Sequence, residues 1–228
     1  MAAFDSGPRR PRGSPARPLR NDARPCSVDA VAGNSMIEVL VSLVIVAVGL
    51  LGLLGLQARA QTAETESYQR AQAIVLLQDI ADRMNTNRTD AWARAYDAAS
   101  VGGAGGLADC SGKAGAALDL CQWGNALKGA AEVTASGTCS SAGNTNCVGA
   151  MIGARGCILY DAATELTKTA STATIAGTGI YTISVAWQGL GPTAAPVSTL
   201  TCGSGLYASE SKRRIVSSTV RIAALGAT

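Results

Sequence analysis

The chain has 228 residues, of which 47% are apolar, 15% are charged and 4% are aromatic, and its net charge is +3. The charged fraction is low, because soluble globular chains usually carry about 25% charged residues. Histidine is absent, which excludes Ser-His-Asp and Cys-His nucleophiles and every metal site that needs an imidazole. With so few aromatic residues, an aromatic platform for nucleic acid is not expected. The sequence also lacks close cysteine pairs, a phosphate-binding loop and the spacing of a nucleophile elbow. We therefore expect no enzyme, no cofactor, no metal site and no nucleic-acid partner.

Residues 1–33 differ from the rest of the chain in charge and in proline content. They contain six arginines against three aspartates and five of the seven prolines, whereas the remaining residues carry equal numbers of basic and acidic side chains. Proline interrupts helices and sheets, and so polar a segment has little apolar surface to bury. We predict a disordered basic leader.

Residues 36–56 form an apolar run, MIEVLVSLVIVAVGLLGLLGL, in which Glu38 is the single charged residue. As a helix the run would span about 32 Å, close to the ~30 Å hydrocarbon core of a bilayer. Because arginines precede the run, the positive-inside rule places the N-terminus in the cytoplasm. The pattern predicts one membrane-spanning helix, with the rest of the chain translocated.

Glu38 and three glycines are the unusual residues of this run. A carboxylate inside lipid costs a few kcal/mol, so Glu38 either lies at headgroup depth or pairs with a cation in the membrane or in a protein assembly. Gly49, Gly52 and Gly55 recur at every third position. They would serve either close packing between helices or local flexibility.

The helix is predicted to continue beyond the membrane, because residues 57–88 contain no glycine or proline. Apolar residues recur there at intervals of three and four, which indicates an amphipathic helix. The predicted apolar stripe consists of Ile74, Leu77, Ala81 and Met84, and the opposite polar side of Gln72, Asp79, Asp82 and Arg83. The result is one continuous helix of about 50 residues, whose second half would pack against a globular head.

The head is predicted to be loop-rich first and strand-rich later. Residues 100–150 are rich in Gly, Ala, Ser and Cys and show little periodicity, which favours loops. Residues 181–188 alternate between apolar and polar side chains and predict a half-buried strand. A second strand is expected over 216–222 and a weaker third over 157–160. Helix followed by strands indicates an α+β fold.

A short basic run, Lys212, Arg213 and Arg214, precedes the last predicted strand. Such a run forms either a binding patch or the solvated entrance of the strand, and we favour the solvated entrance.

The segment Gly33–Leu40 resembles the class III signal of type IV pilins and the related pseudopilins. In that family a basic leader ends in glycine, cleavage follows this glycine, and the fifth residue of the mature chain is glutamate. Gly33 and Glu38 stand at these two positions, and the neighbouring apolar residues also agree. Asn34 stands where the family usually has Phe or Met, and Ser35 stands where it usually has Thr.

The resemblance extends to the C-terminus through four further stretches, 41–57, 78–88, 181–196 and 202–223. There the chain looks most similar to the minor pilins called type IV pilus modification proteins. It implies the pilin fold, in which a long N-terminal helix packs on an antiparallel sheet. The implied organisation is a leader over 1–33, a transmembrane or filament-core helix over 34–56, an amphipathic continuation over 57–90 and an exported head over 91–228.

The family also implies the processing and the partners. A prepilin peptidase would cleave between Gly33 and Asn34, and Asn34 would then be N-methylated. The Glu38 carboxylate would pair with the N-terminal amine of an adjacent subunit. Implied partners are the peptidase, the inner-membrane assembly platform, the major pilin and other minor pilins. The protein would begin in the inner membrane, face the periplasm and enter the extracellular pilus.

Cysteines suggest disulfides in the head. If cleavage follows Gly33, Cys26 is lost and an even number of cysteines remains, which is typical of disulfides in an oxidising compartment. Three disulfides are expected, and 15 pairings are possible. Cys139 and Cys147 flank a polar loop and are the best local pair. The candidates are Cys110, Cys121, Cys139, Cys147, Cys157 and Cys202.

Two alternative functions remain open. A minor pseudopilin of type II secretion would share the same N-terminus. A secreted soluble protein is the other alternative, since Ala58-Arg59-Ala60 is an A-x-A tripeptide of the kind cleaved by signal peptidase. Against it, the apolar run is longer than the 7–15 residues of a usual signal peptide and begins with an acid.

Overall fold

The computed structural model describes residues 35–103, 105–130, 133–134, 137–138, 149–168 and 171–222. The chain divides into two compact units, Met1–Leu50 and Leu51–Thr228. The predicted leader, Gly33, Asn34, Cys139 and Cys147 lie outside the described residues.

Helix α1 (Met36–Thr86) is a single unbroken α-helix of 51 residues and contributes to both units. It contains no proline, and its last glycine is Gly55, so the backbone hydrogen-bond ladder has no interruption through the second half. The sequence-based expectation of one helix of about 50 residues agrees with this element.

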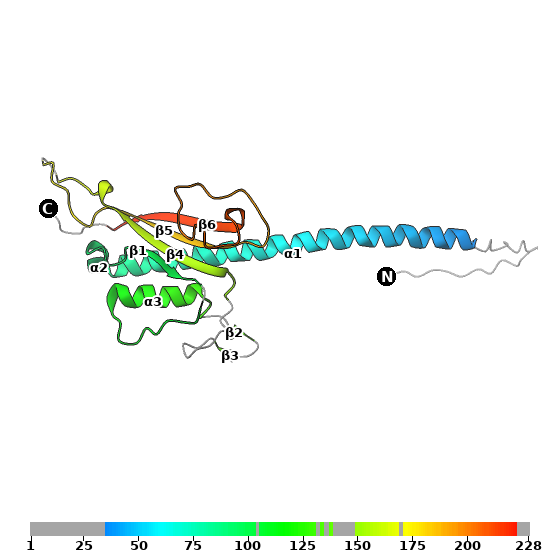
Figure 1. Cartoon of the computed structure of the whole chain (residues 1–228), viewed down its shortest axis with the longest axis horizontal. Coiled ribbons are helices and arrows are strands. Elements are labelled where there is room, and N and C mark those ends of the chain that lie inside the picture. The colour runs from blue at the N-terminus through cyan, green and yellow to red at the C-terminus, as the bar shows by residue number, and fades with distance from the viewer. Residues whose placement is uncertain are drawn as a thin grey trace, which may run out of the picture. The chain divides into compact units, whose positions relative to one another are not determined.

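Four antiparallel strands form the main sheet of the second unit, in the order β1-β4-β5-β6 (Figure 1). They are β1 (Ala98–Gly102), β4 (Ile152–Asp161), β5 (Ile180–Gln188) and β6 (Arg213–Arg221). Among the described strands β6 pairs only with β5, so it forms one edge. The fold is therefore α+β, with a long N-terminal helix packed on an antiparallel sheet.

The remaining elements are short. They are α2 (Arg88–Trp92), α3 (Gly115–Leu127), β2 (Val133–Thr134), β3 (Gly137–Thr138) and the 3₁₀ helices η1 (Ala162–Thr164) and η2 (Glu210–Lys212). Helix α3 lies within residues 100–150, where the sequence predicts a loop-rich region and no helix. Its buried side chains Ala116, Trp123 and Leu127 do follow a helical interval, but the glycine-rich flanks concealed the pattern.

The start of α3 depends on a residue distant in sequence. The Asp90 carboxylate accepts a hydrogen bond from the Ala116 amide at 2.7 Å and another from the Asn87 side chain at 2.9 Å. Ala114, the N-cap residue, supplies no side-chain bond. Asp90 therefore satisfies an amide that a local Ser or Asp would usually satisfy.

The face of α1 that packs in the core differs from the predicted stripe. Leu77 and Met84 are buried as expected, but Ile74 is 42% exposed and Ala81 is only half-buried. The buried residues are Gln69, Ala73, Leu76, Leu77, Ile80 and Met84. One of these residues, Gln69, is polar and could not be found from hydrophobicity. Its amide oxygen accepts a hydrogen bond from the Trp187 indole at 3.2 Å.

Strand β5 is buried on both faces, which corrects the prediction of a half-buried strand. Tyr181, Ile183, Val185 and Trp187 join the core that includes α1 and α3. On the other face Ala186 packs with Cys157 and Cys202. The cover on this second face comes from a loop and a disulfide, which the alternating pattern of β5 could not indicate.

Trp123 of α3 is fully buried and lies directly over Gly156 of β4. Its indole nitrogen donates to the Leu76 carbonyl at 2.8 Å. A Cβ added at Gly156 would overlap the six-membered part of the indole ring. The glycine thus gives α3 the close approach to the sheet that lets Trp123 reach α1.

We expect Gly156→Ala to lower the free energy of unfolding by about 1–3 kcal/mol, because overpacking forces the Trp123 ring or the strand to move. Gly191→Ala is the matched control, since an added Cβ there meets nothing within 4 Å, and should change it by less than ~0.5 kcal/mol. Urea unfolding of the detergent-solubilised protein, followed by tryptophan fluorescence, measures both. Equal stability of the two variants would contradict this packing.

Candidate functional site

The first half of α1 is apolar, and no other described part of the chain covers it. Every residue from Met36 to Leu56 is exposed, and the most apolar 18-residue window of the helix has a mean hydropathy of 2.9 with none of it buried. In length and composition this helix could cross a membrane. A large exposed apolar surface of this kind marks a site of contact with a membrane or with another protein.

Glu38 lies in the first turn of α1. Its backbone amide donates to the Ser35 carbonyl at 2.8 Å, and its own carbonyl accepts from the Ser42 hydroxyl at 2.7 Å. Within the part of the chain that the structure describes, the Glu38 carboxylate itself has no hydrogen-bond or ion-pair partner. An acid near the positive end of the helix dipole is favourably placed, and it is open to a cation from another molecule.

The three glycines of the apolar run are open as well. A Cβ added at Gly49, Gly52 or Gly55 would meet nothing within 4 Å. Both sequence interpretations, close packing of another helix and local flexibility, therefore stay predictions.

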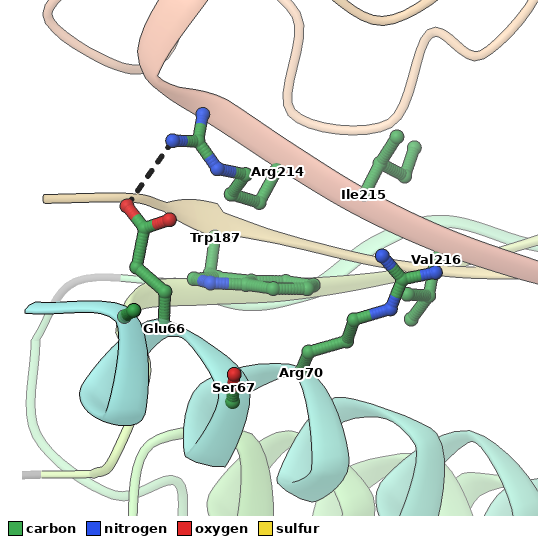
Figure 2. Close-up of a pocket in the computed structure, with 8 residues that line it drawn as sticks. Glu66, Ser67, Arg70, Trp187, Arg214, Ile215 and Val216 are labelled. Atoms are coloured by element: carbon green, nitrogen blue, oxygen red, sulfur yellow. Dashed lines mark hydrogen bonds and ion pairs between the residues drawn. The ribbon is translucent and has the colours of Figure 1, made fainter. Parts of the chain in front are cut away.

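Where α1 meets the sheet, a polar cluster anchors the helix. One Glu66 oxygen pairs with Arg214 of β6 at 3.2 Å and accepts from the amides of Leu190 and Gly191 at 3.2 and 3.3 Å. Figure 2 shows Glu66 and Arg214 facing each other beside the Trp187 ring. The carboxylate thus joins α1 to β6 and to the turn after β5.

The basic run, which includes the first two residues of β6, is not a solvated entrance, and this corrects the prediction. Arg213 is only 3% exposed and donates to Glu210 at 2.6 Å and to the carbonyls of Leu200 and Cys202 at 2.7 and 3.2 Å. Arg214 is also engaged, with Glu66 and the Gly191 carbonyl. Both cations hold the loop before β6, because its carbonyls lack strand partners and need donors.

Two disulfides are present among the described residues, Cys110–Cys121 and Cys157–Cys202. They close loops of 11 and 45 residues and would contribute about 3 and 4 kcal/mol through the entropy of the unfolded chain. The pairing of Cys139 with Cys147 lies outside the described residues and stays a prediction. Both observed bridges stabilise loop-bearing parts of the head.

A second polar cluster surrounds Glu165, in the loop between β4 and β5. Its carboxylate accepts from the Tyr160 hydroxyl and from Arg94, both at 2.6 Å, and from the Gly177 amide at 3.1 Å. The Tyr160 bond, followed by those from Gly177 and Arg94, lowers the pKa of Glu165 to about 2. The Arg94 guanidinium also lies over the Tyr160 ring, 4.6 Å from its centroid. The cluster ties this loop to the segment after α2.

Sequence reasoning missed Glu66, Arg214 and Glu165 as structural anchors. Glu66 and Arg214 are 148 residues apart and Arg94 and Glu165 are 71 residues apart, so no local motif marks either pair. Among the described residues no three Cys, Asp or Glu side chains are grouped so that they could hold a metal ion.

Neither a protein-family model, nor a curated protein, nor a solved structure matches this chain. The fold and the contacts above are therefore the basis for any function assigned to it.

Glu165 makes the stability of the head depend on pH. Because its folded pKa lies below its usual value of 4.5, the ionised form adds stability that is complete above about pH 4.5 and is lost as the pH falls toward 2. We expect Glu165→Gln to be less stable than wild type at pH 6, with a difference that shrinks steadily between pH 4.5 and 2. Urea unfolding across this pH range measures the difference.

Glu64→Gln is the control, because Glu64 is exposed and has no partner among the described residues. Glu64→Gln should change the free energy of unfolding only slightly, and by the same amount at each pH. A difference between wild type and Glu165→Gln that does not change with pH would contradict the role of the Glu165 charge.

Proposed function

We propose that this chain is a minor pilin of the PilV type, a low-abundance subunit that helps prime a type IV pilus and is incorporated into it. The observation that carries the proposal is the division of α1. One unbroken helix has a bare apolar first half with a single acid, and a second half packed on an antiparallel sheet. The resemblance of Gly33–Leu40 to the class III signal supports the same conclusion.

The bare half of α1 suits a subunit that changes surroundings. Before assembly it would lie in the inner membrane, and after assembly in the helical core of the filament. Both surroundings are apolar, so the transfer costs little hydrophobic free energy. The head, held on the second half of α1 by Glu66 and Gln69, would travel with it as one exported body.

In this proposal Glu38 makes assembly specific for a neighbouring subunit that carries a cation at the same depth. An unpaired carboxylate in a dry core is costly, and a cationic partner removes that cost. The N-terminal amine of a neighbouring subunit, released by cleavage after Gly33 or its equivalent, is the partner that the resemblance implies. Proteolysis and assembly would thus be linked, because an uncleaved chain has no amine at this depth.

The other candidate that a structural observation favours is a secreted protein cleaved after Ala60. The described contacts that hold α1 to the head begin at Glu66, so a chain that starts at Gln61 would keep them. A minor pseudopilin of type II secretion would share the same N-terminus, but such proteins usually have a smaller head than this chain.

We expect Glu38→Ala to leave membrane insertion intact, since it makes the span more apolar. It should reduce incorporation into sheared filaments about tenfold or more, because a charge-assisted bond worth about 1.5–3 kcal/mol is lost. Quantitative immunoblotting of sheared pili and of the membrane fraction measures the two effects separately.

Glu64→Ala removes an exposed carboxylate of α1 beyond the apolar run and serves as the matched control, with normal incorporation expected. Normal incorporation of Glu38→Ala would show that Glu38 forms no ion pair in the assembly and is only an interfacial residue.

A further inference from the structure

A groove runs between α1 and the edge strand β6 in the second unit. Two adjoining hollows of about 330 and 440 Å³ share Ala63, Glu66 and Arg214 as lining residues. The first extends along α1 to Arg70 and is bordered by Ile215 and Val216. The second extends to Arg59 and is bordered by Pro192 and Thr193.

Two arginines of α1 give this groove an excess of positive charge. Arg59 and Arg70 are exposed, and neither has a hydrogen-bond or ion-pair partner among the described residues. Arg214 and Glu66 already neutralise each other. In Figure 2 Arg70 extends toward Val216, away from the Glu66–Arg214 pair. The groove therefore presents two cations that its own described lining does not satisfy.

The spacing of these cations fits an extended ligand. Arg59 and Arg70 are 11 positions apart, which is three helical turns plus about 20°, so they lie on one side of α1 about 16 Å apart. In a β-strand, side chains four residues apart share a face and lie about 13 Å apart. The flexible arginine side chains can cover the remaining difference.

The edge of the sheet provides the second element of a binding site. On the described residues β6 has a strand neighbour on one side only, β5. Its other side offers backbone N–H and C=O groups to a further strand. Addition of an extended segment to such an edge is a common mode of peptide recognition, in which the backbone gives affinity and side-chain contacts give specificity.

We propose that the groove between α1 and β6 binds an extended segment of another protein subunit that carries two carboxylates about four residues apart, one for Arg59 and one for Arg70. That the bound segment comes from another subunit rests on the proposed function. The groove and its charge do not depend on that function. The chain's own leader cannot be this ligand, since it is itself basic.

Anionic lipid is the less suitable occupant. Arg59 follows Leu56 by three residues and is close enough to a bilayer surface to meet a phosphate. Arg70 follows Leu56 by 14 residues, or about 21 Å of helix, whereas the headgroup layer is only about 5–8 Å thick. A lipid headgroup could use Arg59 alone.

The test uses the full chain in phosphatidylcholine nanodiscs and the synthetic peptide Thr-Ser-Glu-Val-Thr-Val-Glu-Ser-Thr with a neutral dye, followed by fluorescence anisotropy. We expect the peptide to bind and the version with both glutamates replaced by glutamine to bind much more weakly. Arg59→Gln and Arg70→Gln should each weaken binding about fivefold, the upper range for partly exposed ion pairs, and together about 25-fold. Lys113→Gln, a charge removed outside the groove, should have no effect.

Absence of binding, or equal binding by Arg70→Gln, would overturn the inference. Repeating the assay with phosphatidylglycerol in the discs tests the lipid. Binding of the peptide in phosphatidylcholine discs but not in phosphatidylglycerol discs, with binding in the latter restored by Arg59→Gln alone, would show that Arg59 binds a lipid headgroup. This result would also overturn the inference. Because the assay needs no pili, its failure leaves the proposed function untouched, and that function is tested separately through Glu38.

Discussion

A single helix with two different surroundings is the constraint on which the rest of this structure depends. Through its first half α1 is not covered by any other described residue, and through its second half it supplies one wall of the core. The helix can do both because nothing interrupts its hydrogen bonds between Met36 and Thr86. The sheet and α3 are then built on a face that begins at Gln69 and ends at Met84. A contact made by the exposed apolar half of α1 is therefore made by the same helix that forms part of the core of the head.

The head compensates for a core with few large apolar side chains by using polar and covalent connections. Glu66 joins α1 to β6, Gln69 accepts from Trp187, and the Trp123 indole bonds to the backbone of α1. Glu165 and two disulfides secure the long loops. Buried polar groups that find partners stabilise a particular geometry, whereas apolar contacts alone allow several. The same connections place Arg59 and Arg70 on one side of a groove with the edge strand, so the anchoring of the helix also creates the surface proposed to bind a partner.

The sequence was sufficient for the features that depend on local pattern. Composition located the apolar run, the lack of glycine and proline after Gly55 predicted the helix, and alternation predicted β5. Sequence patterns did not predict the features that depend on contacts between residues far apart in the chain. The apolar pattern places Ile74 in the core, but Ile74 is exposed and the buried face follows Ala73, Leu76 and Ile80. That face also includes Gln69, whose hydrogen-bond partner Trp187 is 118 residues away. Local sequence does not indicate α3, because its first turn is held by the distant Asp90. It predicts a solvated Arg213, because the carbonyls that accept from this side chain belong to a loop whose path is not evident from the sequence. Of the candidate site, Glu38 and the cysteines could be named from sequence, whereas the Arg59–Arg70 groove could not, because it requires the position of β6.

The central claim is that the whole of α1, with Glu38 near its start, belongs to the mature protein. N-terminal sequencing and intact mass of the protein isolated from membranes test this most directly. The account predicts a mature chain that begins at Asn34, which retains Glu38, the apolar run and both groove arginines. A chain that begins at Gln61 would contradict it, because α1 would then lose its bare half together with Arg59, and the protein would be a secreted head.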